Sequence, residues 1–331
     1  MKLKTFKPHN GWLSGIPYGI PTAILLFLSP LLLSSCFTGI ESTPKITYKD
    51  VKKQQVDSTL EQQFALNFKA IPFSQWQPGR RFLLADEKGV YSYSAPTGKI
   101  SEVVKGDTIV YRGLREVTSF TGLPVAELVF TLARNETDTL LYRPGGDAIR
   151  LKSTDNLRLP FLVDLSMVKD ASQLLVGKEL VTRVDRWISP INGFDIKGRK
   201  FLNIKVTAVD AYDENYPFIV SFVSLENENE NGALLMSYTE EEGMPALRGF
   251  ENLFLLENPR SGYDWITDEH WELIRQGRVV EGMTPREVSL ALGTPRDVDR
   301  RHNQSMLYER WSYPGGIYLI FEDGILVSYN I

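Results

Sequence analysis

The chain has 331 residues, which exceeds one typical domain and predicts about two to four folded modules. Its apolar fraction of 43% is enough to build hydrophobic cores. The formal net charge of −4, without an aromatic-rich basic motif, argues against a nucleic-acid-binding protein, because phosphate neutralisation requires a basic surface.

The N-terminal segment has the pattern of a secretion signal. Three lysines within the first seven residues precede an apolar run from Ala23 to Leu33, which Ser29 and Pro30 interrupt. This run is shorter than the roughly 20 apolar residues that a membrane-spanning helix needs. We therefore predict a cleaved signal peptide over residues 1–35; an uncleaved signal anchor is the alternative.

Cys36 is the only cysteine of the chain and directly follows Leu33-Ser34-Ser35. The four-residue run resembles the lipobox of bacterial lipoproteins, in which the cysteine becomes the first mature residue and is linked to diacylglycerol. The resemblance implies lipidation of Cys36 and stable anchoring by two or more acyl chains such as palmitate. Phe37-Thr38 lacks the acidic residue that retains lipoproteins at the inner membrane. The implied location is therefore the outer membrane, with the protein facing the periplasm.

Residues 36–57 are rich in Ser, Thr and Lys and have no sustained periodicity, which predicts a tether. Leu60, Phe64, Ala65 and Phe68 then recur at helical spacing. We expect a short amphipathic helix that opens the first β module, residues 58–160.

Two β-rich segments, residues 58–160 and 161–245, present the same order of features. Each has a glycine entry, two strands, a Lys-Gly turn, two strands, an Asn/Glu-rich loop and a closing strand. The turns are Lys105-Gly106 and Lys197-Gly198. Such self-similarity predicts tandem modules, and several short strands in about 65 residues suit small SH3-like or OB-like barrels. One larger sandwich spanning both segments is the alternative.

Two connecting segments complete the β region. Asp170 to Gln173 can cap a short helix that ends at Gly177. Residues 246–263 contain the apolar cluster Phe250-x-x-Leu253-Phe254-Leu255-Leu256. We interpret this stretch as a linker that carries an apolar clip.

Two helices and three strands are predicted for residues 264–331. Thr267 can cap the first helix, and Thr284-Pro285-x-Glu287 is a capping box for the second, which Gly293 ends. The strands are Met306 to Tyr313, Ile317 to Phe321 and Ile325 to Tyr329. The predicted fold class is therefore mainly β with an α+β C-terminal domain, in which two helices precede a three-stranded antiparallel sheet.

Several pieces of this last segment carry a family resemblance. Gly282-Met283-Thr284 and Leu292-Gly293-x-Pro295, with Ile274 to Val279 and Glu309 to Tyr313, resemble the SmpA/OmlA (BamE-like) outer-membrane lipoproteins. The similarity extends over about Asp264 to Ile331. It implies an accessory scaffold role in outer-membrane assembly or integrity, with other envelope proteins as partners. Family members are typically little more than an anchor and this small domain, so the large β region is a departure, and no interface residue is carried over.

No catalytic or metal-binding pattern stands out. His270 and His302 come without a serine elbow, a free cysteine or a second metal ligand at helical spacing. Asn227-x-Asn229-x-Asn231-Gly232 imitates half of a calcium loop, but Tyr238 occupies the place of the closing Glu. We predict a non-enzyme without cofactor or metal; an envelope hydrolase with two carboxylates in a cleft is the alternative.

Exposed aromatic and arginine side chains are the remaining candidates for function. Trp311 and Tyr313 alternate with Arg310 along one strand, so one face is expected to be core and the other open. We predict partner binding by Tyr308 and Arg310 on the open face, or by Arg300 and Arg301 in a loop over residues 296–303; this loop could equally touch lipid headgroups.

The sequence thus favours a non-catalytic, lipid-anchored scaffold on the periplasmic side of the outer membrane. The alternative is a glycan- or peptidoglycan-binding lipoprotein whose β modules offer aromatic platforms. Its candidate platforms are Trp76, Tyr91, Tyr93 and Trp187.

Overall fold

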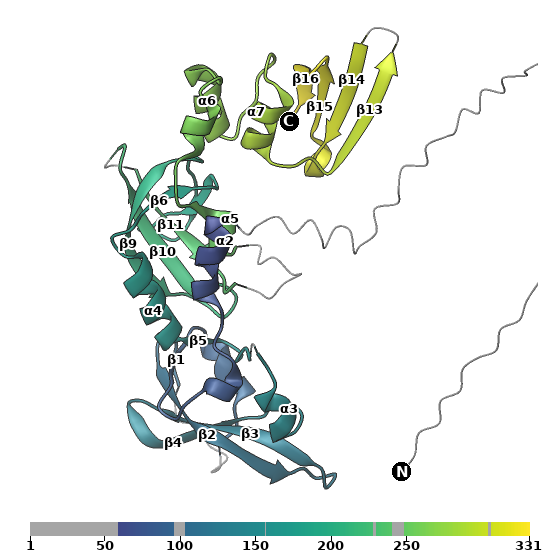
Figure 1. Cartoon of the computed structure of the whole chain (residues 1–331). Coiled ribbons are helices and arrows are strands. Elements are labelled where there is room, and N and C mark those ends of the chain that lie inside the picture. The colour runs from purple at the N-terminus through teal and green to yellow at the C-terminus, as the bar shows by residue number, and fades with distance from the viewer. Residues whose placement is uncertain (1–58, 96–102, 156, 228–229, 240–247, 304–305) are drawn as a thin grey trace, which may run out of the picture. The chain divides into compact units, whose positions relative to one another are not determined.

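The structure is a computed structural model that describes residues 59–331, except 96–102, 156, 228–229, 240–247 and 304–305. The predicted signal peptide, the tether and Cys36 lie outside the described residues. Within the described part, sixteen strands form three antiparallel sheets with a few helices (Figure 1). The predicted mainly-β class with an α+β C-terminal domain is confirmed.

The first sheet has five strands in the order β4-β3-β2-β1-β5. Its strands are β1 (Arg81–Leu84), β2 (Thr108–Thr118), β3 (Pro124–Leu132), β4 (Asn135–Tyr142) and β5 (Leu162–Asp164). The helical segments around it are η2 (Phe73–Gln75), η3 (Glu87–Ser92) and α3 (Ala148–Lys152). The sequence assigned the helix at residue 60 to this first module, but α2 (Leu60–Ala65) and η1 (Leu66–Phe68) pack in the core of the second sheet, where Ala65 and Phe68 share a buried cluster with Phe250. Because β5 pairs with β1, the first sheet extends past residue 160, where the sequence predicted the module to end.

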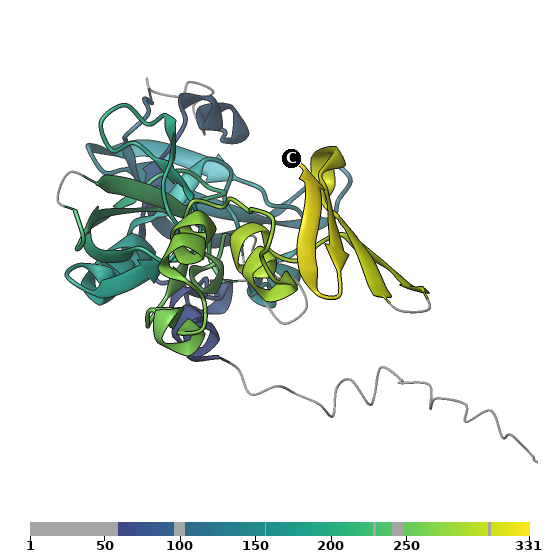
Figure 2. The same cartoon turned by 90° about the horizontal axis from the view of Figure 1, so that it is seen from above.

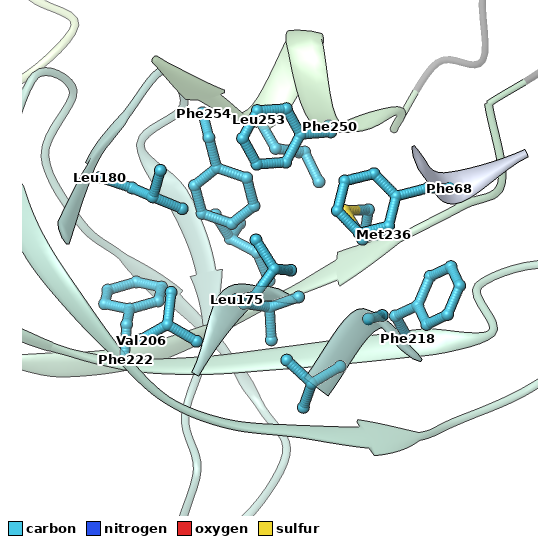
Figure 3. Packing of buried hydrophobic residues seen from close by; sticks show 14 of the residues in the cluster. Phe68, Leu175, Leu180, Val206, Phe218, Phe222, Met236, Phe250, Leu253 and Phe254 are labelled. Carbon is cyan, nitrogen blue, oxygen red and sulfur yellow. The ribbon is translucent and has the colours of Figure 1, made fainter. Parts of the chain in front are cut away.

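The second sheet has seven strands in the order β12-β6-β9-β10-β11-β7-β8. They are β6 (Glu179–Thr182), β7 (Arg186–Ile188), β8 (Asp195–Lys197), β9 (Asn203–Ala211), β10 (Phe218–Ser224), β11 (Asn231–Met236) and β12 (Phe254–Leu255). The interpretation of residues 246–263 as a linker is wrong. α5 (Phe250–Leu253) and β12 lie in this stretch, and Phe250, Leu253 and Phe254 are buried in the core of the second sheet (Figure 3).

The strand pairing of the two sheets repeats residue by residue. In the first sheet Phe130 of β3 lies opposite Tyr111 and Leu140. In the second, Phe222 of β10 lies opposite Val206 and Gly232. Both sheets also have a one-residue register shift at the equivalent position. In β2 the shift follows Tyr111, and in β9 it follows Val206. A β-bulge occupies a specific position in a sheet and does not arise at random. The shared bulge position therefore indicates that the two sheets follow one pairing scheme.

In both copies the segment that follows the first strand, β1 or β6, crosses to the far side of the sheet and pairs with β4 or β11. Ser94 forms an isolated bridge with Leu141 of β4, and Ile188 of β7 pairs with Ala233 of β11. The preceding residues, Tyr93 and Trp187, are buried. Their rings meet Phe130 and Phe222 edge-on, at centroid distances of 6.1 Å and 5.1 Å. The corresponding aromatic therefore fills the centre of each module.

Helix α4 (Leu165–Leu175) joins the two sheets and packs on β9 and β1. The sequence predicted this helix to begin near Asp170, but its N-cap is Asp164, six residues earlier in the chain. The Asp164 carboxylate accepts hydrogen bonds from the Ser166 and Met167 amides and from Nε of Arg80. The earlier cap is favoured because it also completes this partly buried ion pair.

The C-terminal domain consists of α6 (Asp268–Arg275), α7 (Pro285–Leu292) and a sheet in the order β13-β14-β15-β16. Its strands are β13 (Asp297–Asn303), β14 (Met306–Ser312), β15 (Tyr318–Glu322) and β16 (Ile325–Asn330); η4 (Pro259–Tyr263) precedes the domain and η5 (Pro314–Gly316) joins β14 to β15. The two helices lie beside the sheet (Figure 2). The prediction of three strands is wrong: residues 297–303, expected to be a loop, pair with β14 over seven positions. Charged side chains on both faces of this edge strand hide its pattern.

The second module and the C-terminal domain share one core. Val181, Phe201 and Leu255 belong to the same buried cluster as Trp271. Phe201 stacks on Trp271 with ring centroids 5.3 Å apart, and the Lys200 ammonium donates to the carbonyl of Ala291 in α7.

Candidate interaction surface of the C-terminal sheet

The residues that carry the family resemblance tie α7 to the edge of the sheet. Gly282 has a φ of +94°, which favours glycine, and its amide donates to the Leu326 carbonyl of β16 at 2.8 Å. The Leu326 amide donates to the Met283 carbonyl, also at 2.8 Å. Met283 is fully buried, and Thr284 then caps α7. The Gly-Met-Thr motif therefore has a structural role in this domain.

A buried carboxylate joins the two helices. Glu287 accepts hydrogen bonds from the amide and hydroxyl of Thr284, and one of its oxygens lies 2.7 Å from Nδ1 of His270 in α6. Burial acts to raise the pKa of Glu287, but the hydrogen bonds from Thr284 and His270 outweigh it and hold the pKa below its ordinary value. His270 thus has a packing and hydrogen-bonding partner at the helix junction.

The inner face of the sheet is the domain core, as the alternation along β14 predicted. Trp311 is buried, and its indole N–H donates to the Glu309 carboxylate at 2.9 Å. The Tyr313 hydroxyl donates to the Gly293 carbonyl at 3.0 Å, which fixes the end of α7 against the sheet. Leu319 and Phe321 of β15 complete this face.

The outer face carries tyrosine and arginine side chains on neighbouring strands. Tyr308 and Arg310 alternate with the buried residues of β14, and Arg310 lies opposite Ile320 of β15. The Arg310 guanidinium lies 5.0 Å from the ring centroid of Tyr318. Arg310 is exposed, whereas Tyr308 and Tyr318 are half-buried. Side chains of these types dominate binding hot spots, because they offer large contact area with a polar end.

The structure separates the two arginines that the sequence placed in one loop. Arg301 of β13 lies opposite Tyr308 and forms an ion pair with Asp299 at 2.7 Å, on the outer face. Arg300 lies opposite Glu309, and its guanidinium is 3.3 Å from that buried carboxylate, on the inner side. Three of the four predicted partner-binding residues therefore share one face, and Arg300 does not.

The two edges of this sheet differ in charge. β13 carries Asp, Arg and His side chains, which discourage pairing with another strand. β16 has no charged side chain, and its Ile325, Val327 and Tyr329 are 43%, 36% and 40% exposed. The sequence analysis did not single out this edge, although the absence of charge over residues 325–330 was a usable signal.

The aromatic residues proposed as glycan platforms are mostly core residues. Trp76, Tyr93 and Trp187 are buried, so their faces are not open to a sugar ring; Tyr91 is exposed. The sequence analysis did not single out three exposed aromatics, Phe120, Phe194 and Trp265, which are 102%, 71% and 56% exposed; Trp265 lies beside Tyr263. Trp76 and Trp187 cannot serve as platforms because their rings pack in the module cores, Trp76 against Phe73 and Phe82 and Trp187 against Phe222.

A cavity of about 470 Å³ lies where the first sheet meets the β9–β10 turn. Asp86, Lys105, Asp213 and Glu214 contribute charged side chains to its lining. The Asp213 carboxylate accepts the amide hydrogens of Asn215 and Tyr216, as expected of a turn residue. Among the residues that the structure describes, no group of three or more potential ligands is placed to hold a metal ion.

Comparison with known proteins finds no family model that matches the chain and no matching curated protein. Within residues 59–331 as described, no helix is long and apolar enough to cross a membrane.

Proposed function

We propose that the protein is a non-catalytic lipoprotein, anchored through Cys36 at the outer membrane and facing the periplasm. Its C-terminal domain binds other envelope proteins and so supports assembly or integrity of the outer membrane. The observation that carries this proposal is the outer face of the C-terminal sheet, where Tyr308, Arg310 and Tyr318 form an accessible aromatic and cationic surface.

The order of elements supports the comparison with SmpA/OmlA (BamE-like) proteins. Two helices precede an antiparallel sheet, and the Gly-Met-Thr motif fixes the second helix to that sheet. A domain of this kind, held at the membrane by lipid and presenting one sheet face, is suited to scaffolding. We also propose that the two β modules are small barrels of the SH3-like or OB-like kind. The segment after β1 or β6 that pairs with β4 or β11 supports this.

The outer face has the properties of a pre-organised binding site. Stacking of the Arg310 guanidinium on Tyr318 restrains both side chains before a partner arrives, which reduces the entropy lost on binding. Arg301 is already paired with Asp299. It therefore belongs to the rim of the surface and does not supply an unpaired charge at the centre.

Fractionation of cell envelopes tests the anchoring part of this proposal. The full chain with its own signal is compared with Cys36→Ala after separation of inner and outer membranes, and mass spectrometry identifies the lipid on Cys36. We expect the wild type in the outer membrane with acylated Cys36, and the variant outside that fraction. A wild-type protein that stays in the inner membrane, or an unmodified Cys36, would contradict the proposal.

A further inference from the structure

The β2–β3 hairpin ends in an exposed apolar tip. Residues 117–125 contain no charged side chain, and Phe120 and Leu123 are 102% and 65% exposed. The two strands form a long ribbon at the far end of the first sheet from α4 (Figure 1). Exposed aromatic and aliphatic side chains at the end of a rigid ribbon cost free energy in water, so a partner that buries them is expected.

The polar groups of this tip bond to one another. The Ser119 amide donates to the Leu123 carbonyl at 2.8 Å, and the Gly122 amide donates to the Ser119 carbonyl at 2.9 Å. The Leu123 amide donates to the Ser119 hydroxyl oxygen at 3.1 Å, and that hydroxyl lies 2.9 Å from the Thr121 hydroxyl. Backbone groups without partners are costly in an apolar medium, so these internal hydrogen bonds lower the cost of inserting the tip there.

The first arginine side chains below the tip lie at a depth that suits a bilayer surface. Arg115 pairs with Glu127 three strand positions below the last pair, Thr118 and Pro124, which is about 10 Å along the ribbon. Arg115 and Arg143 both bond to the buried Glu127 carboxylate and remain about half exposed. Interfacial segments bury apolar side chains about 5–10 Å into the headgroup and acyl boundary, and arginine extends its charged end to the headgroups. Glu116, the one acidic residue nearer the tip, is exposed.

We propose that the tip of the β2–β3 hairpin inserts into the interfacial layer of the bilayer that holds the anchor. The inference rests on the proposed lipid anchor for its location. The chain between Cys36 and Thr59 spans at most about 80 Å when fully extended. Anchoring would therefore hold the tip near the membrane at an effective concentration on the order of 1 mM, so weak insertion is sufficient.

A single labelled cysteine at the tip tests this proposal. Full chain carrying Cys36→Ala and Leu123→Cys is labelled with an environment-sensitive fluorophore. It is held on phosphatidylcholine and phosphatidylglycerol vesicles by an N-terminal histidine tag and a nickel-chelating lipid, so the result does not depend on acylation. The matched control is Ile191→Cys, at the tip of the β7–β8 hairpin, where Ile191 is 89% exposed.

Brominated lipids are expected to quench the label at residue 123 and not the label at residue 191. Phe120→Ser should lower the quenched fraction about tenfold, because the inserted aromatic area is lost, whereas Phe194→Ser should leave it unchanged. Quenching at residue 123 with an unmodified wild-type Cys36 would retain this inference and reject only the anchor. Absence of quenching at residue 123 on vesicle-bound protein overturns the insertion of the tip.

Discussion

The two β modules keep the same strand pairing but fill their centres differently. In the first, Tyr93 lies over Phe130, and Leu140 faces Phe130 from β4. In the second, the larger Trp187 lies over Phe222, and the facing residue is Gly232. A Cβ on Gly232 would lie 3.0 Å from the Trp187 ring. The larger ring of Trp187 is therefore compensated by the missing side chain of Gly232. The two modules share backbone register and core volume, but not the identity of the residues that fill the core.

Truncating the central aromatic is expected to have the largest effect. Trp187→Ala should destabilise the second module by about 3–5 kcal/mol, because the indole is 2% exposed and its removal leaves a cavity. Tyr93→Ala should cost less, since a smaller ring is lost. Hydrogen-exchange mass spectrometry, which reports each module separately, measures both. Equal loss of protection in the two variants would contradict the compensation between the two centres.

An ion cluster of the first module has an apolar counterpart in the second. Glu127 is fully buried between Arg115 and Arg143, and the corresponding residue of β10 is Ile219. Arg115→Ala with Arg143→Ala should cost about 3 kcal/mol, because a buried carboxylate loses its partners.

Adding Glu127→Ile to that double variant should restore most of the stability. The substitution removes the unpaired buried carboxylate and places the apolar side chain that the second module has at this position. Urea denaturation of the three proteins checks this. A triple variant as unstable as the double variant would show that the two positions are not equivalent.

Exchanging the central residues tests the volume compensation itself. Gly232→Leu alone should cost about 1–3 kcal/mol by overpacking against Trp187. Combined with Trp187→Tyr it should cost less than the sum of the two single changes, because the pair then resembles Tyr93 and Leu140. A double-mutant cycle measured by thermal denaturation gives the coupling energy between the two substitutions. Additive effects would contradict the volume compensation.

The two Lys-Gly turns look alike in sequence but need glycine for different reasons. Gly106 has a φ of +95° and open space around it, so the backbone conformation requires glycine. At Gly198 a Cβ would lie 2.1 Å from the Trp187 indole, so space requires it. Asn tolerates positive φ, so Gly106→Asn should cost only about 1 kcal/mol, whereas Gly198→Asn should cost more. Melting temperatures of the two variants compare them, and the opposite ranking would contradict this account.

The smallest expected effect concerns the helix caps on either side of the modules. α2 is capped by Thr59 and the uncharged Gln62, whereas α7 is capped by Thr284 and Glu287. The pKa of Glu287 is below its unfolded value of 4.5, so its stabilisation is present above pH 4.5 and is lost as pH falls through the folded pKa. Exchange at α7 should rise in that acidic window. Exchange at α2 should rise too: burial acts to raise the pKa of Glu61 in its first turn, but hydrogen bonds from the Glu61 and Leu256 amides outweigh it and hold the pKa below its ordinary value, so the variant is read out at α7. Glu287→Gln should remove the pH dependence; its persistence would assign the effect to another group.

Much of the fold was predictable where local signals agree. The bounds of α6 and α7 follow from Thr267, Thr284 and Gly293, and the inner face of β14 follows from its alternation. The strand register aligns Gly106 with Phe201 rather than with Gly198, so the two Lys-Gly turns that suggested tandem modules are not equivalent positions.

Other features depend on tertiary pairing that no local pattern reveals. The two-residue strand β12 and the short α5 are stabilised by the sheet and core they join, so their sequence reads as a linker. The edge strand β13 is too charged to show an apolar period. For the candidate site, alternation correctly placed Tyr308 and Arg310, whereas the opposite orientations of Arg300 and Arg301 required the register with β14.

The most direct test of the proposed scaffold role is photo-crosslinking in living cells. A photoreactive amino acid replaces Tyr308 on the outer face of the C-terminal sheet, and the control replaces Arg300 on the inner side of the neighbouring strand. The account predicts that Tyr308 captures a defined envelope protein, identified by mass spectrometry, and that Arg310→Ala weakens this crosslink while position 300 gives none. Equal crosslinking at both positions, or none at residue 308 in correctly localised protein, would contradict partner binding by this face.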